Sequence, residues 1–265
     1  MENNAPVSLN ISQEGIAFVT LNRPEKRNAF DEIMISALND IFLTLKGADN
    51  VRIIFIKGAG HHFCAGADLE WMQRQARHDI EDNERDALDL AQMLNHLYNL
   101  PQITVALVEG GAYGGGLGLI ACCDYSIATE KSHFCFSETR IGLVPATISP
   151  YVIEAIGVKN ARGLFTLAMP FDAHQAKAIG LIQEIALDSD DFAKREERLA
   201  DLGFCASPNA IAKTKETIDL VKNREIDSHL MKETAKIIAH ARAADDGIEG
   251  LSAFLEKRKP NWIKT

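Results

Sequence analysis

Residues 110–118 read GGAYGGGLG, and the apolar run LIACC follows directly. Six of these nine residues are glycine, which is costly inside a helix because it loses the most conformational freedom on folding. The stretch follows an apolar strand predicted at 103–110 and precedes a predicted helix. We therefore expect a strand, a glycine-rich turn and a helix, with another group held close to the backbone of the turn.

One interpretation of this order is a dinucleotide site. Residues 116–121 match the pattern G-x-G-x-x-A, which places phosphates at the N-terminus of a helix. Such a fold also has an acidic ribose partner at the end of the next strand, usually about 20 residues further on. Here the next predicted strand ends at Thr129 and Glu130, well short of that spacing. The sequence therefore disfavours a Rossmann oxidoreductase.

A second interpretation is a site for an oxyanion. Free N–H groups at a helix N-terminus stabilise negative charge, and glycines let a flat substrate group lie against the peptide plane. The stretch HHFCAGADLEWM at 61–72 also follows a strand and begins a helix, so two N–H donors could meet at one carbonyl oxygen. The alternative is close packing of helix on strand, which also requires glycine.

The stretch FSETRIGLVP at 136–145 contributes a candidate acid–base group. Glu138 follows a short apolar strand and precedes a turn rich in glycine and proline. A carboxylate that enters an apolar pocket has its pKa raised toward values useful for proton transfer. The alternative is a surface glutamate paired with Arg140.

Composition excludes several classes of protein. The 265 residues are 46% hydrophobic and 25% charged, as in soluble globular proteins, and carry a net charge of −9. That charge disfavours a nucleic-acid surface, whereas the local basic stretch EKRKPNW at 256–262 favours one small anionic ligand. Because neither a signal peptide nor an apolar run of membrane-spanning length is found, we expect a cytoplasmic protein without membrane contact.

Cysteine and histidine give no convincing metal or nucleophile site. The five cysteines lie mostly in apolar surroundings, which is typical of reduced, packed thiols. A catalytic cysteine is disfavoured because no matching arrangement of His and Asn accompanies it. His61 and His62 with Cys64 suggest a metal, but no complementary ligand pair has a suitable spacing. We therefore expect solvated loop histidines.

Strands and helices alternate over most of the chain, which predicts an α/β core. Strands are expected at 7–12, 16–21, 51–57, 103–110, 124–129, 133–136 and 181–187. The first two form a hairpin, Asp31 begins a helix, and another helix covers about 80–97. From about 190 to 256 only helices are expected.

We divide the chain into a core at 1–195 and a C-terminal helical region at 196–265. The helices of the second region carry apolar faces, formed by Ile218, Leu220, Val221, Leu230, Ile237 and Ile238. One small layer of helices cannot bury all of them. They pack either on a partner subunit or on the chain's own core, and periodicity alone does not distinguish the two.

Together these segments resemble the enoyl-CoA hydratase/isomerase (crotonase) superfamily. The resemblance begins with LNRPEKRNAF (21–30), continues through FCAGADL, EGGAYGGGLGL, ACCDYSIA and FSETRIGLVP, and ends with GIEGLSAFLEKRKPNW (247–262). It implies an α/β spiral of ββα turns, followed by a C-terminal helical region that builds homotrimers, commonly paired into hexamers. The implied substrate is an acyl-CoA thioester, with no metal or redox cofactor.

The resemblance also assigns site residues by motif position. The oxyanion donors would be the backbone N–H groups of Ala67 and Gly115, and the catalytic carboxylate would be Glu138. The CoA moiety would be held by residues of the core and of the C-terminal region, the latter often from a neighbouring subunit: Lys26, Arg27, Ala65, Asp68, Leu69, Phe254 and Lys257. The two early cations would meet CoA phosphates.

One position departs from the family pattern. Hydratases of this family typically hold water between two glutamates, and the position of the first is Gly118 here. A single carboxylate orients water less well, although it suffices to move a proton between carbons, as in an enoyl-CoA isomerase.

The local sequence AYGGGLGLIACCD…SETRIGLVPATISPYV most resembles methylglutaconyl-CoA hydratases. This favours hydration of a 2-enoyl-CoA by Glu138 alone, with help from the substrate's own distal carboxylate. The alternatives are a single-glutamate isomerase and a non-catalytic acyl-CoA binding protein.

Overall fold

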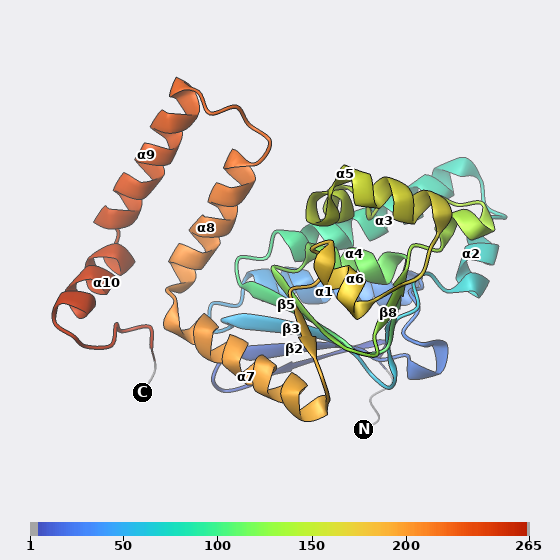
Figure 1. Cartoon of the computed structure of the whole chain (residues 1–265), viewed down its shortest axis with the longest axis horizontal. Coiled ribbons are helices and arrows are strands. Elements are labelled where there is room, and N and C mark those ends of the chain that lie inside the picture. The colour runs from blue at the N-terminus through green and yellow to red at the C-terminus, as the bar shows by residue number, and fades with distance from the viewer. Residues whose placement is uncertain (1–4, 264–265) are drawn as a thin grey trace.

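The computed structural model describes residues 5–263 and arranges its strands in two sheets (Figure 1). The larger sheet has the order β1-β2-β3-β5-β7-β10, with strands Val7–Ile11, Ile16–Leu21, Ile53–Gly58, Ile103–Val108, Tyr125–Thr129 and Glu184–Ala186. The smaller has the order β4-β6-β8-β9, with strands His62–Cys64, Gly111–Tyr113, His133–Cys135 and Phe171–Asp172. In the larger sheet β1 pairs antiparallel with β2, and the other pairs are parallel.

The chain winds as a spiral because consecutive strands enter different sheets. β3 lies in the larger sheet and β4 in the smaller, and β5 with β6 and β7 with β8 repeat this alternation. A helix follows each pair, so each turn reads strand, strand, helix. The described strands of the larger sheet are added in chain order, without the reversal at which a Rossmann fold binds its ligand. The predicted spiral of ββα turns is confirmed.

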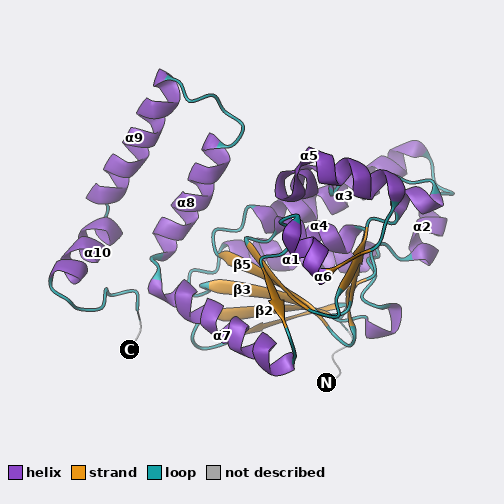
Figure 2. Cartoon of the chain, in the orientation of Figure 1, coloured by secondary structure: helices purple, strands orange, loops and turns teal. Residues whose placement is uncertain are grey.

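Helices cover both faces of the larger sheet (Figure 2). One face carries α1 (Glu32–Lys46), α3 (Ile80–Tyr98), α4 (Gly115–Cys122) and α5 (Ser149–Leu167), and the other carries α7 (Ser189–Cys205). The shorter helices and those of the C-terminal part are α2 (Leu69–Gln75), α6 (Ala173–Ala178), α8 (Pro208–Val221), α9 (Ser228–Ala243), α10 (Asp245–Leu255) and the 3₁₀ helices η1 (Pro24–Lys26) and η2 (Glu138–Ile141).

Strand β3 shows how both faces of the sheet are buried. Ile54 and Ile56 point into the main core under α1 and α3, whereas Ile53 and Phe55 join a second cluster with Phe192 of α7. Successive side chains of a strand point to opposite faces. A strand buried on both faces is therefore an uninterrupted apolar run, as this one is.

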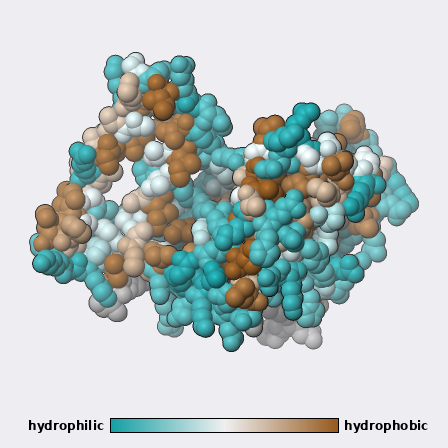
Figure 3. All heavy atoms as spheres, in the orientation of Figure 1, coloured by the Kyte–Doolittle hydropathy of each residue, from teal (hydrophilic) through white to brown (hydrophobic). Residues whose placement is uncertain are grey.

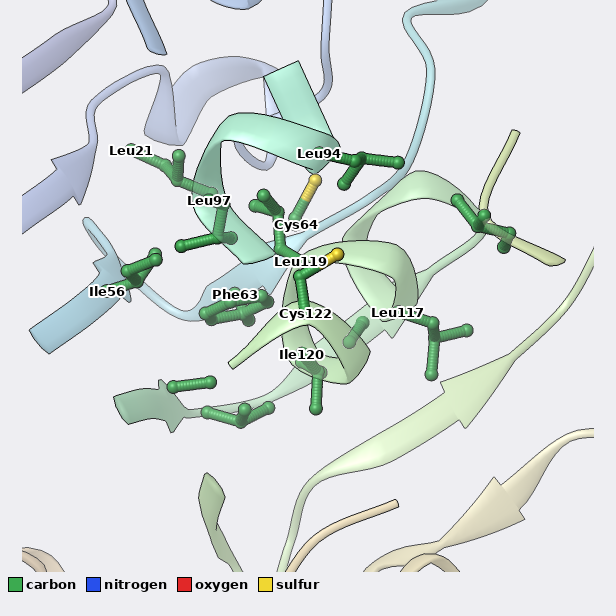
Figure 4. Close-up of a cluster of buried hydrophobic side chains, with 14 of the residues drawn as sticks. Leu21, Ile56, Phe63, Cys64, Leu94, Leu97, Leu117, Leu119, Ile120 and Cys122 are labelled. Atoms are coloured by element: carbon green, nitrogen blue, oxygen red, sulfur yellow. The ribbon is translucent and has the colours of Figure 1, made fainter. Parts of the chain in front are cut away.

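Helix α4 is buried on nearly all sides. Leu117, Leu119 and Ile120 are at most 1% exposed, and Figure 4 shows α4 beside Leu94 and Leu97 of α3. A helix surrounded by other elements must be apolar all round. The N-terminus of α4 therefore lies inside the protein. The polar groups that it presents there are backbone N–H groups.

Most predicted elements are confirmed. The hairpin, the helix capped by Asp31, the helix at 80–97 and the all-helical C-terminal part are present. The sequence pattern predicts β8 from the run at 133–136, but it does not predict β4, β6 or β9, since strands of two or three residues seldom show a hydrophobic period.

The glycine stretch is therefore not one continuous turn. Gly110, with φ of 66°, separates β5 from β6, and Gly114, with φ of 46°, separates β6 from α4. Both φ values favour glycine. A Cβ on Gly110 would also lie 2.0 Å from the carbonyl oxygen of His61. Both glycines turn the chain, and Gly110 also admits the neighbouring backbone.

Helices α8 to α10 project from the body as an arm (Figure 1). The predicted division at 195/196 falls within α7, whose Phe192 packs on the larger sheet, so the arm begins with α8. The first four and last two residues of the two predicted regions lie outside the described range. Among the described residues, none of the helices has the length and apolar character needed to span a membrane.

The arm leaves much of its apolar surface uncovered in a single chain. Of the predicted apolar faces, Leu230 is buried, but Ile218 and Ile238 are 54% and 50% exposed. Figure 3 shows hydrophobic side chains along this arm. The chain's own core therefore covers only part of these faces.

Candidate active site

A pocket of about 790 Å³ lies where the N-termini of α2 and α4 meet. It is lined by every predicted site residue of the core: Lys26, Arg27, Ala65, Ala67, Asp68, Leu69, Gly115 and Glu138. Much of the remaining wall is apolar, with Phe30, Met72, Leu143 and Ile148 among its residues. A concave, largely apolar site with a few polar groups is typical of small-molecule binding.

Two glycines bring the two loops of this pocket into backbone contact. A Cβ on Gly116 would lie 2.8 Å from both the Cβ and the carbonyl oxygen of Cys64. One on Gly66 would lie 2.9 Å from the carbonyl oxygen of Tyr113. Real Cβ atoms do not approach so closely, so only glycine lets the two loops touch. Close packing is thus present, and it holds the backbone of both loops in one pocket.

The N–H groups of Ala67 and Gly115 are available to a ligand. Phe30 forms a parallel bridge with Ala67: its N–H donates to the Gly66 carbonyl, and its carbonyl accepts from the Asp68 N–H, both at 2.7 Å. The N–H of Ala67 itself therefore points away from Phe30. Gly115 is the first residue of α4, where a helix leaves its N–H groups unpaired. Among the described residues, neither N–H finds a backbone acceptor.

Glu138 enters the same pocket beside the N-terminus of α4. It is the first residue of η2, and its Oε1 lies 2.9 Å from where a Cβ on Gly114 would be. Burial raises the pKa of Glu138, and its Oε2 is buried without a hydrogen-bond partner among the described residues. A carboxylate removed from water and poorly hydrogen-bonded exchanges a proton more readily near neutral pH.

The alternative, an ion pair between Glu138 and Arg140, is not found among the described residues. Arg140 instead donates to the carbonyl oxygen of Ala168 at 2.7 Å. Ala168 is the left-handed cap at the end of α5, so this bond fastens η2 to that helix. Glu138 is therefore left without the cationic partner that would lower its pKa.

Three of the predicted CoA residues, Lys26, Arg27 and Leu69, lie at the exposed side of the pocket. The Nζ of Lys26 pairs with Glu70 at 3.0 Å. Arg27 follows with φ of 53°, and its carbonyl accepts the N–H of Ala65 at 2.9 Å. Leu69, at the start of α2, is 68% exposed. Cationic and apolar groups thus lie next to each other on accessible surface.

Asp68 has a structural role in this wall. Its carboxylate accepts the N–H groups of Glu70 at 2.9 Å and Trp71 at 3.3 Å, which caps α2, and it binds Arg23 at 3.1 Å. Burial alone raises the pKa of Asp68, but these partners outweigh burial and lower that pKa below its ordinary value. A contact of Asp68 with CoA would therefore come from its backbone.

We expect Asp68→Ala to lower the free energy of unfolding at pH 7 by about 2 kcal/mol, because the helix cap and one of the two carboxylate partners of Arg23 are lost. Asp68→Asn should cost less, since an amide oxygen still caps the helix. Because folding lowers the pKa, the carboxylate stabilises the fold above about pH 4, and this contribution disappears as the pH falls through the native pKa. Urea denaturation between pH 7 and 3 measures both effects, and a difference between wild type and Asp68→Ala that does not shrink toward pH 3 contradicts this.

Phe254 and Lys257 are not brought to this pocket by the fold of a single chain. They lie at the end of α10 and beyond it, and Figure 1 shows their arm on the opposite side of the body from α2. Phe254 is 81% exposed. A role for these two residues thus requires another copy of the chain.

Sequence reasoning missed several pocket residues, of which Phe30 is an example. Its ring lies 2.8 Å from where a Cβ on Gly115 would be, so it packs directly on the α4 backbone. The two residues are far apart in the sequence, and an apolar residue before a helix predicts only core packing. No local signal distinguishes Phe30 from an ordinary core residue.

The histidines and cysteine of 61–64 have separate environments. His61 is exposed, as expected, but His62 is half-buried and its Nδ1 accepts the Gly111 N–H at 3.3 Å. Cys64 is buried, which raises the pKa of its thiol to about 12. No group of three or more His, Cys, Asp and Glu side chains in residues 5–263 is arranged to hold a metal.

Known proteins share both this sequence and this fold. Residues 11–265 match the family model described as enoyl-CoA hydratase/isomerase. The crystal structure of an enoyl-CoA hydratase from Shewanella pealeana superposes with a TM-score of 0.93 at 39% identity, covering 97% of this chain and 96% of that one. Pseudomonas aeruginosa AtuE superposes with a TM-score of 0.93 at 34% identity, covering 98% and 100%.

A curated relative gives the same result from sequence. The enoyl-CoA hydratase AKT6-1 of Alternaria alternata is 33% identical over 82% of this chain and 71% of its own length. With a family model that spans nearly all residues and a matching fold, the chain belongs to the enoyl-CoA hydratase/isomerase family.

Proposed function

We propose that this protein hydrates 2-enoyl-CoA thioesters through a thioester enolate, with Glu138 as its single acid–base group. The observation that carries the proposal is that Glu138 and the N–H groups of Ala67 and Gly115 line one pocket. Family membership supports an acyl-CoA substrate, and the name of the Alternaria relative supports hydration. In this scheme CoA arrives as part of the substrate, and no metal or redox cofactor takes part.

In the proposed reaction the two N–H groups hold the thioester oxygen, and Glu138 first accepts a proton and then returns it. The two N–H groups and the dipole of α4 bind the thioester oxygen and stabilise the negative charge that develops on it. The Glu138 carboxylate takes a proton from water as the water oxygen adds to C3, and the electrons of the C2=C3 double bond move into the enolate. Glu138 then returns the proton to C2, so that H and OH have added across the double bond.

A second candidate is a single-glutamate isomerase, and the apolar wall at Ile148 favours it. Ile148 is 2% exposed and offers no second polar group to hold water. Glu138 could then remove a proton from C2 of a 3-enoyl-CoA and return it to C4. We nevertheless propose 3-methylglutaconyl-CoA as the substrate, because its own distal carboxylate would supply the missing help in orienting water.

A turnover screen with crotonyl-CoA, 3-hexenoyl-CoA and 3-methylglutaconyl-CoA tests this function. Hydration removes the ultraviolet absorbance of the conjugated double bond, and isomerisation creates it. We expect 3-methylglutaconyl-CoA to be hydrated fastest. Background hydration of that substrate, together with rapid isomerisation of 3-hexenoyl-CoA, would establish the isomerase in its place.

Removing both rim cations, Lys26→Ala with Arg27→Ala, is expected to raise KM about tenfold with little change in kcat, because both groups meet phosphates rather than reacting atoms. The KM of wild type should also rise with salt more steeply than that of the variant. The matching acyl-pantetheine, which lacks the nucleotide phosphates, is the control. An equal rise of KM with acyl-pantetheine would show that the loss is structural.

We further propose a cytoplasmic homotrimer, alone or paired into a hexamer, assembled through the arm. The half-exposed Ile218 and Ile238 and the exposed Phe254 support an interface there. Phe254 and Lys257 would then complete the CoA site of a neighbouring subunit. Sedimentation equilibrium gives the mass in solution, and a monomer at micromolar concentration would contradict the assembly.

A further inference from the structure

The start of α4 carries two glycines, and a different side chain covers each. Gly114 is the N-cap of α4, and Gly118 lies in the helix four residues later. A Cβ on Gly114 would lie 2.9 Å from Oε1 of Glu138, and a Cβ on Gly118 would lie 2.4 Å from Cγ2 of Ile148. The carboxylate thus covers the N-cap and the isoleucine covers a position four residues further along, and both side chains line the pocket.

The position at Gly118 is closed by two helices. Ile148 is the N-cap residue of α5, is 2% exposed, and its carbonyl accepts the Val152 N–H at 3.1 Å. The second neighbour is Leu94 of α3, whose Cδ1 would lie 3.5 Å from the added Cβ (Figure 4 shows Leu94 beside α4). Any side chain at 118 therefore meets apolar atoms on both helices, and overpacking of this kind destabilises a core.

We propose that Ile148 is a specificity-determining residue that restricts the site to one carboxylate. Its side chain fills the space that a side chain at position 118 would need, four residues along the chain from Gly114, which Glu138 covers. The inference rests on the proposed function, because it concerns the reaction that Glu138 carries out. It requires that position 118 accepts a functional side chain only after Ile148 is made smaller.

A double-mutant cycle of Gly118→Glu, Ile148→Ala and the combined variant, made in the full chain, tests this. Gly118→Glu alone is expected to lower Tm by about 5 °C or more and turnover by more than about tenfold. In the combined variant the space left by Ile148 receives the new side chain. Tm should then recover by at least about half, and crotonyl-CoA hydration should rise at least about tenfold above Ile148→Ala, because two carboxylates orient water better than one.

Ile156→Ala provides the matched control, since Ile156 is also a buried isoleucine of α5 but does not line the pocket. Combined with Gly118→Glu, it should rescue neither Tm nor turnover. Equal rescue by Ile156→Ala would overturn the proposal, as would additive Tm effects in the cycle. Recovery of Tm without faster hydration would also overturn it, since Ile148 would then act only in packing.

Turnover of the wild type and the Tm values of the mutant cycle separate this inference from the proposed function. A wild-type protein that turns over none of the acyl-CoA substrates would refute the proposed function, and with it a role for Ile148 in the reaction. If the Gly118→Glu variants do not fold, the cycle is repeated with Gly118→Ala, which adds one methyl group and no charge. Loss of Tm with Gly118→Ala that Ile148→Ala does not reverse would again overturn the proposal.

Discussion

Glu138→Gln is expected to lower kcat by about a thousandfold, while the dissociation constant for CoA stays within about twofold of wild type. Glutamine keeps the size and the position of the side chain beside Gly114 but can neither take nor give the proton. In the proposed mechanism this proton passes from water to C2 by way of Glu138 alone. No second carboxylate lies at position 118 to take over its part.

The pH profile of the wild type should report the same group. Burial raises the pKa of Glu138, and the proposed reaction needs its carboxylate form. We therefore expect kcat/KM to fall as the pH drops through an apparent pKa above about 4.3, the ordinary value for glutamate. This acidic limb should be absent from the residual activity of Glu138→Gln.

Glu109→Gln is the matched control for this variant. Glu109 is an exposed glutamate between β5 and β6 and does not line the pocket. The control should keep wild-type turnover and the acidic limb. Glu138→Gln with wild-type turnover would exclude Glu138 as the acid–base group, and absence of turnover in the wild type with intact CoA affinity would favour a non-catalytic acyl-CoA binding protein.

The sequence predicted the elements that have a strong period or a cap. The buried strand β3 is a continuous apolar run in the sequence. The start of α1 is indicated by Asp31, whose side chain caps the helix by accepting the Met34 N–H at 2.8 Å. Both signals lie within a few residues of the chain. Glu138 could be proposed as the acid–base group from its local sequence, whereas the family resemblance and its motifs were needed to mark Ala67 and Gly115 by position.

The contacts that shape the site could not be predicted, because they join segments distant in the sequence. Whether Gly116 admits a substrate or a neighbouring loop depends on Cys64, which ends β4 in the preceding turn of the spiral and is far from Gly116 in the sequence. The same holds for Ile148 on Gly118. A glycine in the sequence indicates that another group packs close to the backbone, but only the fold shows which group this is.

Gly116→Ala is expected to lower kcat by about a hundredfold, although it adds only one methyl group and replaces neither Glu138 nor the rim cations Lys26 and Arg27. The new Cβ would lie 2.8 Å from the Cβ and the carbonyl oxygen of Cys64. Neither atom is the end of a flexible side chain, so the loop at 64–67 has to move away from α4. That movement changes the separation of the Ala67 and Gly115 N–H groups, and a shift of about 1 Å at such donors costs about two orders of magnitude in rate.

Gly163→Ala is the matched control, because an added Cβ at Gly163 of α5 meets nothing within 4 Å. It should keep wild-type kcat and gain about 0.5–1 kcal/mol of stability, since alanine loses less conformational freedom in a helix than glycine.

Rates measured well below the Tm of each variant separate a displaced loop from simple unfolding. KM should change less than kcat, because the rim cations Lys26 and Arg27 lie outside the displaced segment. Wild-type kcat in Gly116→Ala would mean that the contact with Cys64 does not set the donor spacing, and the oxyanion role of the two N–H groups would lose its geometric basis.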